Sequence, residues 1–441
     1  MRGRRALARL RRLTAVRPTG RGAGVLTSGV VLAATGVVLD LPDLVGLGAA
    51  ALLAVAAAWT TLAWQRLDAG RGALDVVRSV DPNPVVAGQP ATTRLTVRAR
   101  ARTGAAFERL ARLRLSEQAA HELAGSTGIR ARVRTQPDHI AVHYGLVPGR
   151  RGRWPLGPVL TTRTDVFGLA RTTQPLGEAT RVAVWPRTTP LPVRSAALGD
   201  VDRAATGARL ASTDDSVLRE YVAGDDPRRV HWTASARQGH LMVRADEGAG
   251  VRPVSVLLDR ALLAPAPDDR PGARHPGALA VSDGEWAVEL AASVAVSFLE
   301  GGHPTRLVST SPEPTRTEHV GSVRSGRSRL LDATVDLVGL RGADAAQALE
   351  RTARTMRADR SRGEITVAVL APQDEPGRHA LAALGTDGTC WALLVVAPSK
   401  DPGADVEATG DALRAAGWRV ATCTPGTAAE RAWSALTERA E

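Results

Sequence analysis

The sequence predicts three structural regions in a row: an N-terminal two-helix transmembrane hairpin, an all-β immunoglobulin-like sandwich, and a C-terminal α/β domain of Rossmann type. Three observations lead to this prediction. Long uncharged segments lie near the N-terminus, residues that alternate with period two follow, and apolar strands then alternate with amphipathic helices. A chain of 441 residues has room for two or three domains.

Two uncharged segments, residues 22–39 and 44–65, predict the transmembrane hairpin. At about 1.5 Å per residue they would extend roughly 27 and 33 Å, which is enough to cross the hydrocarbon core of a bilayer. Trp59 and Trp64 stand where an interfacial aromatic belt is expected. The alternative is an Ala-rich helical hairpin inside a soluble core, because Ala and Gly are only weakly lipophilic.

The distribution of arginine predicts the orientation of the hairpin. Residues 1–21 contain eight arginines and no acidic residue, and further arginines follow the second segment, whereas the loop between the segments carries only Asp40 and Asp43. Since positively charged flanks stay in the cytoplasm, residues 1–21 are expected to form a basic cytoplasmic tail. We therefore expect a multi-pass protein of the cell membrane with both termini in the cytoplasm.

The composition excludes several classes of protein. Only Lys400 among the 57 basic residues is a lysine, so the net charge of +12 reflects a general preference for arginine. Nucleic-acid binding would need basic clusters interleaved with aromatic residues, and aromatic residues make up only 3% of the chain. Cys390 and Cys423 are too few and too far apart for a disulfide framework or a Cys-x-x-Cys site.

Residues 75–190 predict the β-sandwich. The segments 95–97 and 140–146 alternate with period two, and turns rich in Pro and Gly separate such segments. His139 and His143 fall in or beside the second segment. Exposed strand positions explain them better than a metal site, because no third ligand is spaced nearby.

Residues 252–441 predict the α/β domain, with a mainly parallel sheet covered on both faces. The expected strands are residues 254–259, 306–309, 365–370 and 392–396, and the expected helices are residues 285–299, 376–384 and 404–416. Ligand sites of open α/β sheets lie at the carboxyl ends of the strands. There, Asp259 ends the first strand, and residues 264–284 predict a long loop.

Residues 217–247 concentrate the unusual chemistry of the chain. Five arginines, five acidic residues, two histidines and a tryptophan fall in this window, and their balanced charge does not suit a polyanion site. Asp226 as N-cap and Pro227 as first helical residue predict the start of a short helix, and Gly239 predicts its end. Pairing of arginine with carboxylate around Asp225 is the expected use of the other polar groups.

This window resembles the signature of the domain-of-unknown-function family 58 (DUF58). The signature residues that carry the resemblance are Arg219, Glu220, Tyr221, Gly224, Asp225, Arg228, His231, Trp232, Ser235, Arg237 and Arg244. Residues 152–158 and 165–169 resemble the upstream pattern of the family, in which proline usually stands at the place of Val166. The resemblance covers residues 24–310 and continues more weakly to the end, and residues 191–247 are the signature segment.

The resemblance implies a membrane-anchored protein with a von Willebrand factor A-like domain, which would be the α/β region here. Members of the family are often encoded beside a MoxR-type AAA+ ATPase and a transglutaminase-like membrane protein, so these are the expected partners. No biochemical activity is established for the family. The signature residues are accordingly expected to form a charge-paired interaction surface, not a catalytic site.

A von Willebrand A domain holds a divalent cation through Asp-x-Ser-x-Ser, a carboxylate followed by two hydroxyls. Here, Asp259 is followed by Arg260, Ala261, Leu262 and Leu263, so both hydroxyls are missing and Arg260 adds a positive charge. Asp259 is thus the only candidate ligand for Mg²⁺, and we expect no bound cofactor. Its alternative role is to cap a loop or to pair with an arginine.

The predicted function is that of a non-enzymatic, membrane-anchored adaptor or scaffold, which acts with the AAA+ ATPase in the assembly or maturation of protein complexes. Two alternatives stay open: metal-dependent binding of a ligand or protein by the α/β domain, and a hydrolase that uses Asp225 and His231. The chain has no Gly-x-Ser-x-Gly motif, and its sole lysine cannot complete a P-loop.

Overall fold

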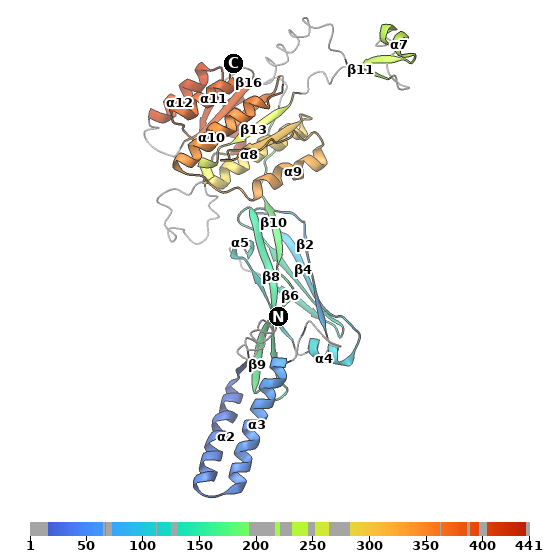
Figure 1. Cartoon of the computed structure of the whole chain (residues 1–441), viewed down its shortest axis with the longest axis vertical. Helices are drawn as coiled ribbons and strands as arrows, with labels where there is room; N and C mark the ends of the chain where they lie inside the picture. Colours follow the sequence, from blue (N-terminus) through green and yellow to red (C-terminus); the bar gives the residue numbers. More distant parts are fainter. Residues whose placement is uncertain are drawn as a thin grey trace. The chain divides into compact units, whose positions relative to one another are not determined.

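In the computed structural model (Figure 1), the chain forms two compact units, Met1–Val184 and Trp185–Glu441. The residues that the structure describes are 16–64, 67, 73–111, 113–124, 131–193, 217–220, 232–245, 252–263, 283–361, 363–385, 389–396 and 404–437. The first unit holds two apolar helices and two sheets of antiparallel strands, and the second holds a parallel sheet.

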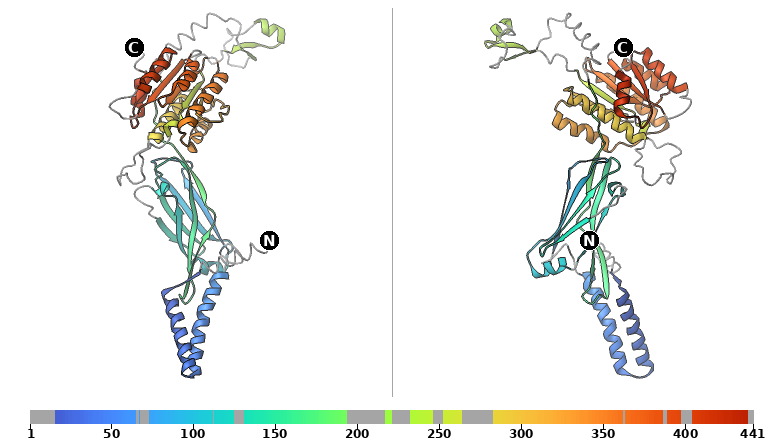
Figure 2. Two further views of the ribbon diagram at one scale, coloured as in Figure 1. Left: turned by 60° about the vertical axis from the view of Figure 1, so that its left-hand side comes forward. Right: turned by 180° about the vertical axis from the view of Figure 1, so that it is seen from behind.

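Two helices near the N-terminus, α2 (Gly20–Val38) and α3 (Pro42–Trp64), are the described helices that are long and apolar enough to cross a membrane. This confirms the two apolar helices predicted from the sequence. They lie side by side in both views of Figure 2. The close approach depends on glycine, because a Cβ atom on Gly48 would lie 2.6 Å from the backbone nitrogen of Ala33. The buried residues of α2, spaced by seven, are Gly22, Gly29 and Gly36.

The strands of the first unit form two sheets. Within the described residues, one sheet has six strands, in the order β1-β9-β8-β10-β3 with β5 beside β8, and the other has four, in the order β2-β4-β7-β6. The strands are β1 (Val16–Pro18), β2 (Leu74–Asp81), β3 (Val85–Val86), β4 (Ala91–Ala99), β5 (Arg114–Ala119), β6 (Ala131–Thr135), β7 (His139–Leu146), β8 (Gly152–Thr164), β9 (Ala170–Leu176) and β10 (Thr180–Trp185). In the four-stranded sheet, each strand pairs antiparallel with its neighbour. In the six-stranded sheet, β1 pairs antiparallel with β9, and β8 pairs antiparallel with β5, β9 and β10.

The two sheets share one apolar core, which explains their period-two alternation. Its members include Leu95 and Val97 of β4, Ile140 and Val142 of β7, and Leu156 and Val159 of β8. Two short helices, α4 (Gly104–Ala111) and α5 (His121–Ala124), lie on the connections between strands. The immunoglobulin-like connection of the strands stays a prediction.

The second unit is built on a parallel sheet. Within the described residues it has five strands, in the order β14-β13-β15-β16-β17, and each neighbouring pair is parallel, as the sequence predicts. The strands are β13 (Val254–Leu258), β14 (Thr305–Ser309), β15 (Ile365–Leu370), β16 (Thr389–Val395) and β17 (Arg419–Cys423). Counted from β13, the order is 2-1-3-4-5, which is that of flavodoxin-type doubly wound folds and not the 3-2-1-4-5-6 order of the Rossmann fold.

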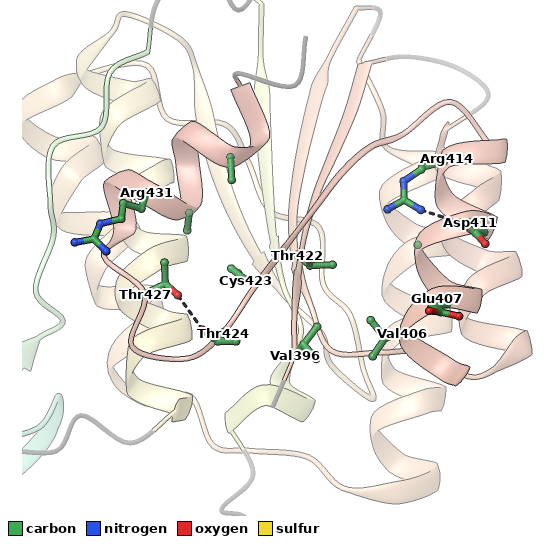
Figure 3. A pocket seen from close by; sticks show the side chains of 13 residues that line it. Val396, Val406, Glu407, Asp411, Arg414, Thr422, Cys423, Thr424, Thr427 and Arg431 are labelled. Carbon is green, nitrogen blue, oxygen red and sulfur yellow. Dashed lines mark hydrogen bonds and ion pairs between the residues drawn. The ribbon is translucent and has the colours of Figure 1, made fainter. Parts of the chain in front are cut away.

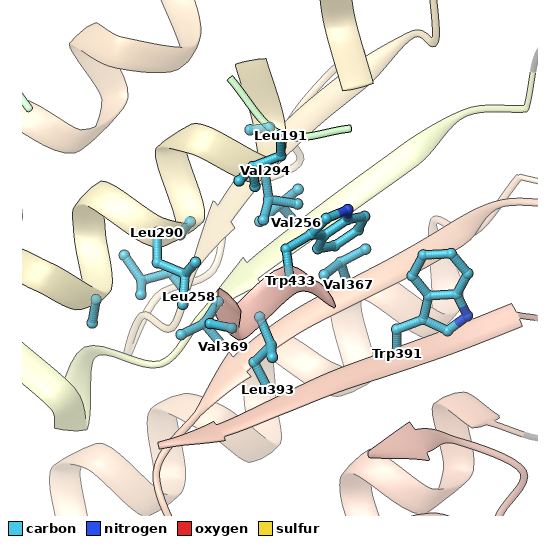
Figure 4. Packing of buried hydrophobic residues seen from close by; sticks show 14 of the residues in the cluster. Leu191, Val256, Leu258, Leu290, Val294, Val367, Val369, Trp391, Leu393 and Trp433 are labelled. Atoms are coloured by element: carbon cyan, nitrogen blue, oxygen red, sulfur yellow. The ribbon is translucent and has the colours of Figure 1, made fainter. Parts of the chain in front are cut away.

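Helices cover both faces of this sheet. On one face pack α8 (Asp283–Glu300), α9 (Val323–Val335) and α13 (Ala429–Thr437), and on the other α10 (Gly342–Ala358), α11 (Glu375–Gly385) and α12 (Ala404–Ala415). Val256 and Leu258 of β13 join the core on the α8 side, whereas Leu257 joins the core on the α10 side (Figure 4). Because β13 is covered on both faces, all of its residues are buried.

The extended segment 185–193 packs against α8 and belongs to the second unit. The backbone N–H of Thr189 donates to the hydroxyl of Ser293 (3.0 Å), and that of Leu191 donates to the hydroxyl of Ser297 (2.9 Å). These two serines, one turn apart on the helix, therefore hold the segment in register along it.

Candidate functional site

The signature segment contains a two-stranded sheet and a short helix. The elements are β11 (Val217–Glu220), α7 (Trp232–Gln238) and β12 (Met242–Ala245). The strands pair antiparallel, with Arg219 opposite Val243, Glu220 opposite Met242 and Leu218 opposite Arg244. We call this set the signature module. Its two strands carry three of the predicted signature residues, Arg219, Glu220 and Arg244.

Other predicted residues of this segment lie outside the described residues. They are Tyr221, Gly224, Asp225, Arg228 and His231, together with the predicted helix start at Asp226 and Pro227. The predicted helix end is confirmed, because Gly239 has a φ of 76° and its N–H donates to the carbonyl of Ser235 (3.0 Å).

Trp232 is the large apolar side chain of α7, and 70% of its surface is exposed. Arg237, near the end of the same helix, is also exposed, whereas Ser235 is half-buried. Tryptophan is highly buried on average, because its indole carries a large apolar surface. Helix α7 therefore presents an aromatic and a cationic side chain to solvent.

Asp259 lies where a doubly wound fold binds its ligands, between the carboxyl ends of β13 and β15. The residue is 1% exposed. Its carboxylate accepts hydrogen bonds from the N–H groups of Ala261 (3.0 Å) and Ala371 (3.2 Å) and from the side-chain amide of Gln373 (2.8 Å). Burial raises the pKa of the Asp259 carboxyl, and these hydrogen bonds oppose the rise.

Further hydrogen bonds connect the residues around Asp259. The hydroxyl of Thr310, just past β14, accepts from the N–H of Arg260 (2.8 Å), and the Arg260 guanidinium donates to the carbonyl of Val338 (2.6 Å). The hydroxyl of Thr409 on α12 accepts from the N–H of Gln373 (2.9 Å). Gln373, Thr310 and Thr409 were missed from the sequence, because they lie far from Asp259 along the chain and no local pattern marks them.

The surroundings of Asp259 do not fit a hard divalent cation, which takes several oxygen ligands. The groups within hydrogen-bonding distance of its carboxylate are N–H donors. The residues that follow it form the 3-10 helix η2 (Arg260–Leu263), which contains no hydroxyl. In the described part of the chain, no group of three or more His, Cys, Asp or Glu side chains could hold a metal ion. The structure thus offers Mg²⁺ a single carboxylate here.

A groove of about 740 Å³ lies along β17, between α12 and α13 (Figure 3). The charged residues that line it are Glu407, Asp411, Arg414 and Arg431. Asp411 and Arg414 form an ion pair (2.8 Å), and the hydroxyls of Thr424 and Thr427 share a hydrogen bond (3.1 Å). Burial raises the pKa of the Cys423 thiol on its wall to about 12, which disfavours the reactive thiolate form.

A buried charged cluster lies at the amino end of the same sheet. The Arg306 guanidinium is 2.9 Å from the Glu364 carboxylate, and their side chains are 5% and 1% exposed. Ser255 accepts from Arg306 (2.5 Å) and donates to Glu364, and His319 Nε2 lies 3.7 Å from Glu364. Burial alone would raise the pKa of Glu364, but the nearby His319 imidazole, hydrogen bonds from Ser255 and the Ser361 N–H, and the Arg306 charge lower it to about 2.

This cluster contains a serine, a histidine and a glutamate, but it is not a catalytic triad. In a triad the histidine accepts the proton of the serine hydroxyl and the acid orients the histidine. Here the Ser255 hydroxyl donates directly to Glu364. The arrangement therefore neutralises a buried arginine and does not activate a nucleophile.

Comparison with known proteins finds a family to which part of the chain is similar. Residues 217–401 match the family model described as protein of unknown function DUF58, which agrees with the resemblance of the signature segment. No curated protein matches the chain.

Among solved structures, a von Willebrand factor type A protein from Catenulispora acidiphila is similar with 12% identity and a TM-score of 0.28, over 43% of this chain and 42% of that chain. A point mutant of the PilB minor pilin from Streptococcus sanguinis is similar with 8% identity and a TM-score of 0.30, over 73% of this chain and 78% of that chain. The chain thus spans less than half the length of the von Willebrand protein.

Proposed function

We propose that this chain is a non-enzymatic, membrane-anchored adaptor or scaffold protein, whose signature module binds a partner. The exposed indole of Trp232 carries the proposal. Tryptophan and arginine are enriched among the few side chains that dominate the binding energy of protein interfaces. Trp232 and the exposed Arg237 both belong to α7, in the segment that matches the DUF58 model.

The interior of the second unit supports binding over catalysis. A general acid or base must come within hydrogen-bonding distance of its substrate. Asp259 and Glu364, the buried carboxyl groups at the two ends of the parallel sheet, are each 1% exposed and already hydrogen-bonded to the protein. The hydrolase alternative, with Asp225 and His231, stays a prediction about residues outside the described ones.

The proposed partner is a MoxR-type AAA+ ATPase, with a transglutaminase-like membrane protein as a second partner and the assembly or maturation of protein complexes as the task. In this proposal α2 and α3 anchor a multi-pass protein of the cell membrane. Both termini lie in the cytoplasm, which the arginine-rich residues 1–21 support. The β-rich region is immunoglobulin-like and the parallel sheet belongs to a von Willebrand A-like domain.

Crosslinking of the full chain, reconstituted in vesicles, to the purified ATPase tests this proposal. Trp232→Ala and Arg237→Ala are each expected to lower the affinity roughly thirtyfold or more, because a dominant interface side chain contributes about 2 kcal/mol or more. Arg354→Ala is the matched control, since Arg354 on α10 is also an exposed arginine (69%). Absence of a crosslink between the wild-type chain and the ATPase would remove this partner from the proposal.

A second candidate function is ligand binding by the α/β region, and the groove beside β17 favours it. Among the described strands, β17 stands at one edge of the sheet. An edge strand offers its backbone N–H and C=O groups to an added strand. An extended peptide from the partner would suit this groove, whose walls carry both acidic and basic side chains. Arg431 lines the groove, and Arg431→Glu should weaken the crosslink if the groove takes part.

This second function needs no metal in our proposal. Calorimetric titration of the full chain with Mg²⁺ or Mn²⁺ is expected to give no binding heat, because Asp259 is surrounded by N–H donors. A saturable heat that disappears in Asp259→Ala would restore metal-dependent binding.

A further inference from the structure

The tip of the hairpin between β8 and β9 exposes two large apolar side chains. Val166 and Phe167 are each 75% exposed. We propose that this tip inserts into the membrane beside α2 and α3, at the boundary between lipid headgroups and acyl chains. The inference rests on the membrane anchorage proposed above and adds a second lipid contact to the same unit.

The pairing of β1 with β9 fixes the direction in which the tip points. The two strands are antiparallel, with Pro18 opposite Ala170, and β1 leads through Thr19 into α2. The residues that precede Ala170, on the way to the tip, therefore extend in the same direction as α2. Where α2 enters the bilayer, the tip enters with it.

Hydrogen bonds and close packing hold the tip against the first turn of α2. The N–H of Thr19 donates to the carbonyl of Leu169 (2.9 Å), and its hydroxyl donates to the carbonyl of Gly168. The Thr19 hydroxyl also caps α2 by accepting from the N–H of Gly22 (3.1 Å). A Cβ atom on Gly22 would lie 1.8 Å from the Leu169 carbonyl oxygen, so the hairpin touches the helix through its backbone.

The position of Gly22 relative to the hydrocarbon core of the bilayer determines how deeply the tip inserts. The uncharged segment 22–39 begins at this residue and extends about 27 Å, close to the roughly 30 Å of a hydrocarbon core. A helix with so little spare length can cross only if Gly22 lies near the boundary of the core. Leu169 also shares a buried cluster with Val55 and Ala58 of α3, so the tip lies alongside both helices.

Backbone contacts fix the shape of the tip. The N–H of Asp165 donates to the carbonyl of Ala170 (3.1 Å), and the N–H of Gly168 donates to the carbonyl of Asp165 (3.1 Å). The Asp165 carboxylate accepts from the N–H groups of Phe167 (2.9 Å) and Ala170 (2.6 Å). Backbone groups paired in this way cost less on entry into lipid, and a tip that is already ordered loses little entropy.

Arginines beside the tip suit an anionic bilayer surface. Arg17, Arg21 and Arg171 are exposed, and Arg17 lies opposite Arg171 in the β1–β9 pair. Arginine lays its apolar stem along the membrane boundary while its guanidinium reaches the lipid phosphates. An apolar tip next to several arginines has the chemistry of a lipid-binding loop.

Site-specific fluorescence on the full chain tests the inference, in vesicles of phosphatidylcholine and phosphatidylglycerol. Both native cysteines are buried, so a polarity-sensitive fluorophore can be attached at Phe167→Cys. Leu53→Cys, 69% exposed on α3, reports on the helices, and Val133→Cys, 60% exposed on β6 in the other sheet, is the matched apolar control. We expect the label at position 167 to be quenched by lipid that carries a spin label near its headgroup and to be protected from aqueous iodide.

The three labels separate failure of the inference from failure of the anchorage. Iodide quenching at position 167 as strong as at position 133, with position 53 protected, would overturn the insertion of the tip and leave the anchorage intact. Iodide quenching at position 53 would overturn the anchorage and the inference together. Protection at positions 53 and 167, with position 133 quenched, supports both.

Discussion

The two ends of the parallel sheet each bury a carboxyl group, but they stabilise it in different ways. Asp259, at the carboxyl end, accepts hydrogen bonds from uncharged donors such as the Gln373 amide, and burial raises its pKa. Glu364, at the amino end, has the His319 imidazole 3.7 Å away, accepts from the Ser255 hydroxyl and the Ser361 N–H, and pairs with Arg306. Its pKa falls to about 2.

The difference shows that burial alone does not decide the charge state of a carboxyl group. Asp259 and Glu364 are both 1% exposed, so both lose most of their contact with water. At Glu364 the neighbouring His319 imidazole, hydrogen bonds from Ser255 and the Ser361 N–H, and the Arg306 charge together outweigh this loss. At Asp259 three hydrogen bonds from neutral donors do not outweigh it. Both groups are engaged inside the protein, whereas Trp232 on α7 is exposed.

Removal of Glu364 is expected to have the largest effect on stability. In Glu364→Ala the guanidinium of Arg306 stays buried without its carboxylate, and breaking one partner of such a pair costs about 3–5 kcal/mol. Urea unfolding of the full chain in detergent measures the loss. The control is Glu350→Ala, which breaks an exposed pair with Arg354 (2.9 Å) and should cost less than about 1 kcal/mol. Equal losses would contradict the buried charge pair.

Removal of Asp259 is expected to have a smaller effect. Asp259→Ala removes the acceptor of the Ala261 and Ala371 N–H groups and one of the two acceptors of the Gln373 amide. Such a change costs about 1–3 kcal/mol. The same unfolding measurement applies. Asp259→Asn keeps one acceptor oxygen and should recover part of the loss. A loss as large as that of Glu364→Ala would remove the difference between the two ends of the sheet.

The two carboxyl groups should also respond to pH in opposite directions. The pKa of Glu364 is lowered, so its contribution to stability is present above its ordinary pKa of 4.5 and is lost as pH falls toward about 2. The pKa of Asp259 is raised, so its contribution is present below its ordinary pKa of 3.8 and is lost as pH rises through the raised pKa.

Unfolding free energies of matched variants measure this difference in sign. The stability gap between wild type and Glu364→Gln should shrink as pH falls below 4.5. The gap between wild type and Asp259→Asn should shrink as pH rises from 3.8. Both gaps are measured a second time in chains that also carry His319→Gln. This removes the imidazole, which lies 3.7 Å from Glu364, from the comparison. Gaps that move in the same direction with pH would refute the comparison.

The smallest effect on stability is expected at Trp232. Because its side chain is 70% exposed, Trp232→Ala should change the free energy of unfolding by no more than about 0.5 kcal/mol. The same variant should still lose the crosslink to the partner. Loss of stability by several kcal/mol would show that the indole acts within the fold and not as a docking residue.

Local patterns predicted the elements whose signals are strong. The uncharged segments predicted α2 and α3, and the apolar strands predicted a parallel sheet. Helix α10 was missed, because its buried face consists largely of small or polar residues: Ala345, Ala348, Leu349, Thr352, Ala353 and Met356. The short strand β17 was missed because it mixes Arg419 and Thr422 with apolar residues, so its period-two alternation is weak.

The sequence by itself determined the two apolar helices, the parallel sheet, the end of α7 at Gly239 and the position of Asp259 after its strand. These features depend on residues a few positions apart, so a local pattern is enough to reveal them. The tertiary structure decided what surrounds them: the strand order 2-1-3-4-5, the Gln373 amide on Asp259, the Arg306 guanidinium on Glu364, and the contact of Leu169 with the start of α2. Those contacts join residues more than 50 positions apart, and only the packing of strands and helices brings them together.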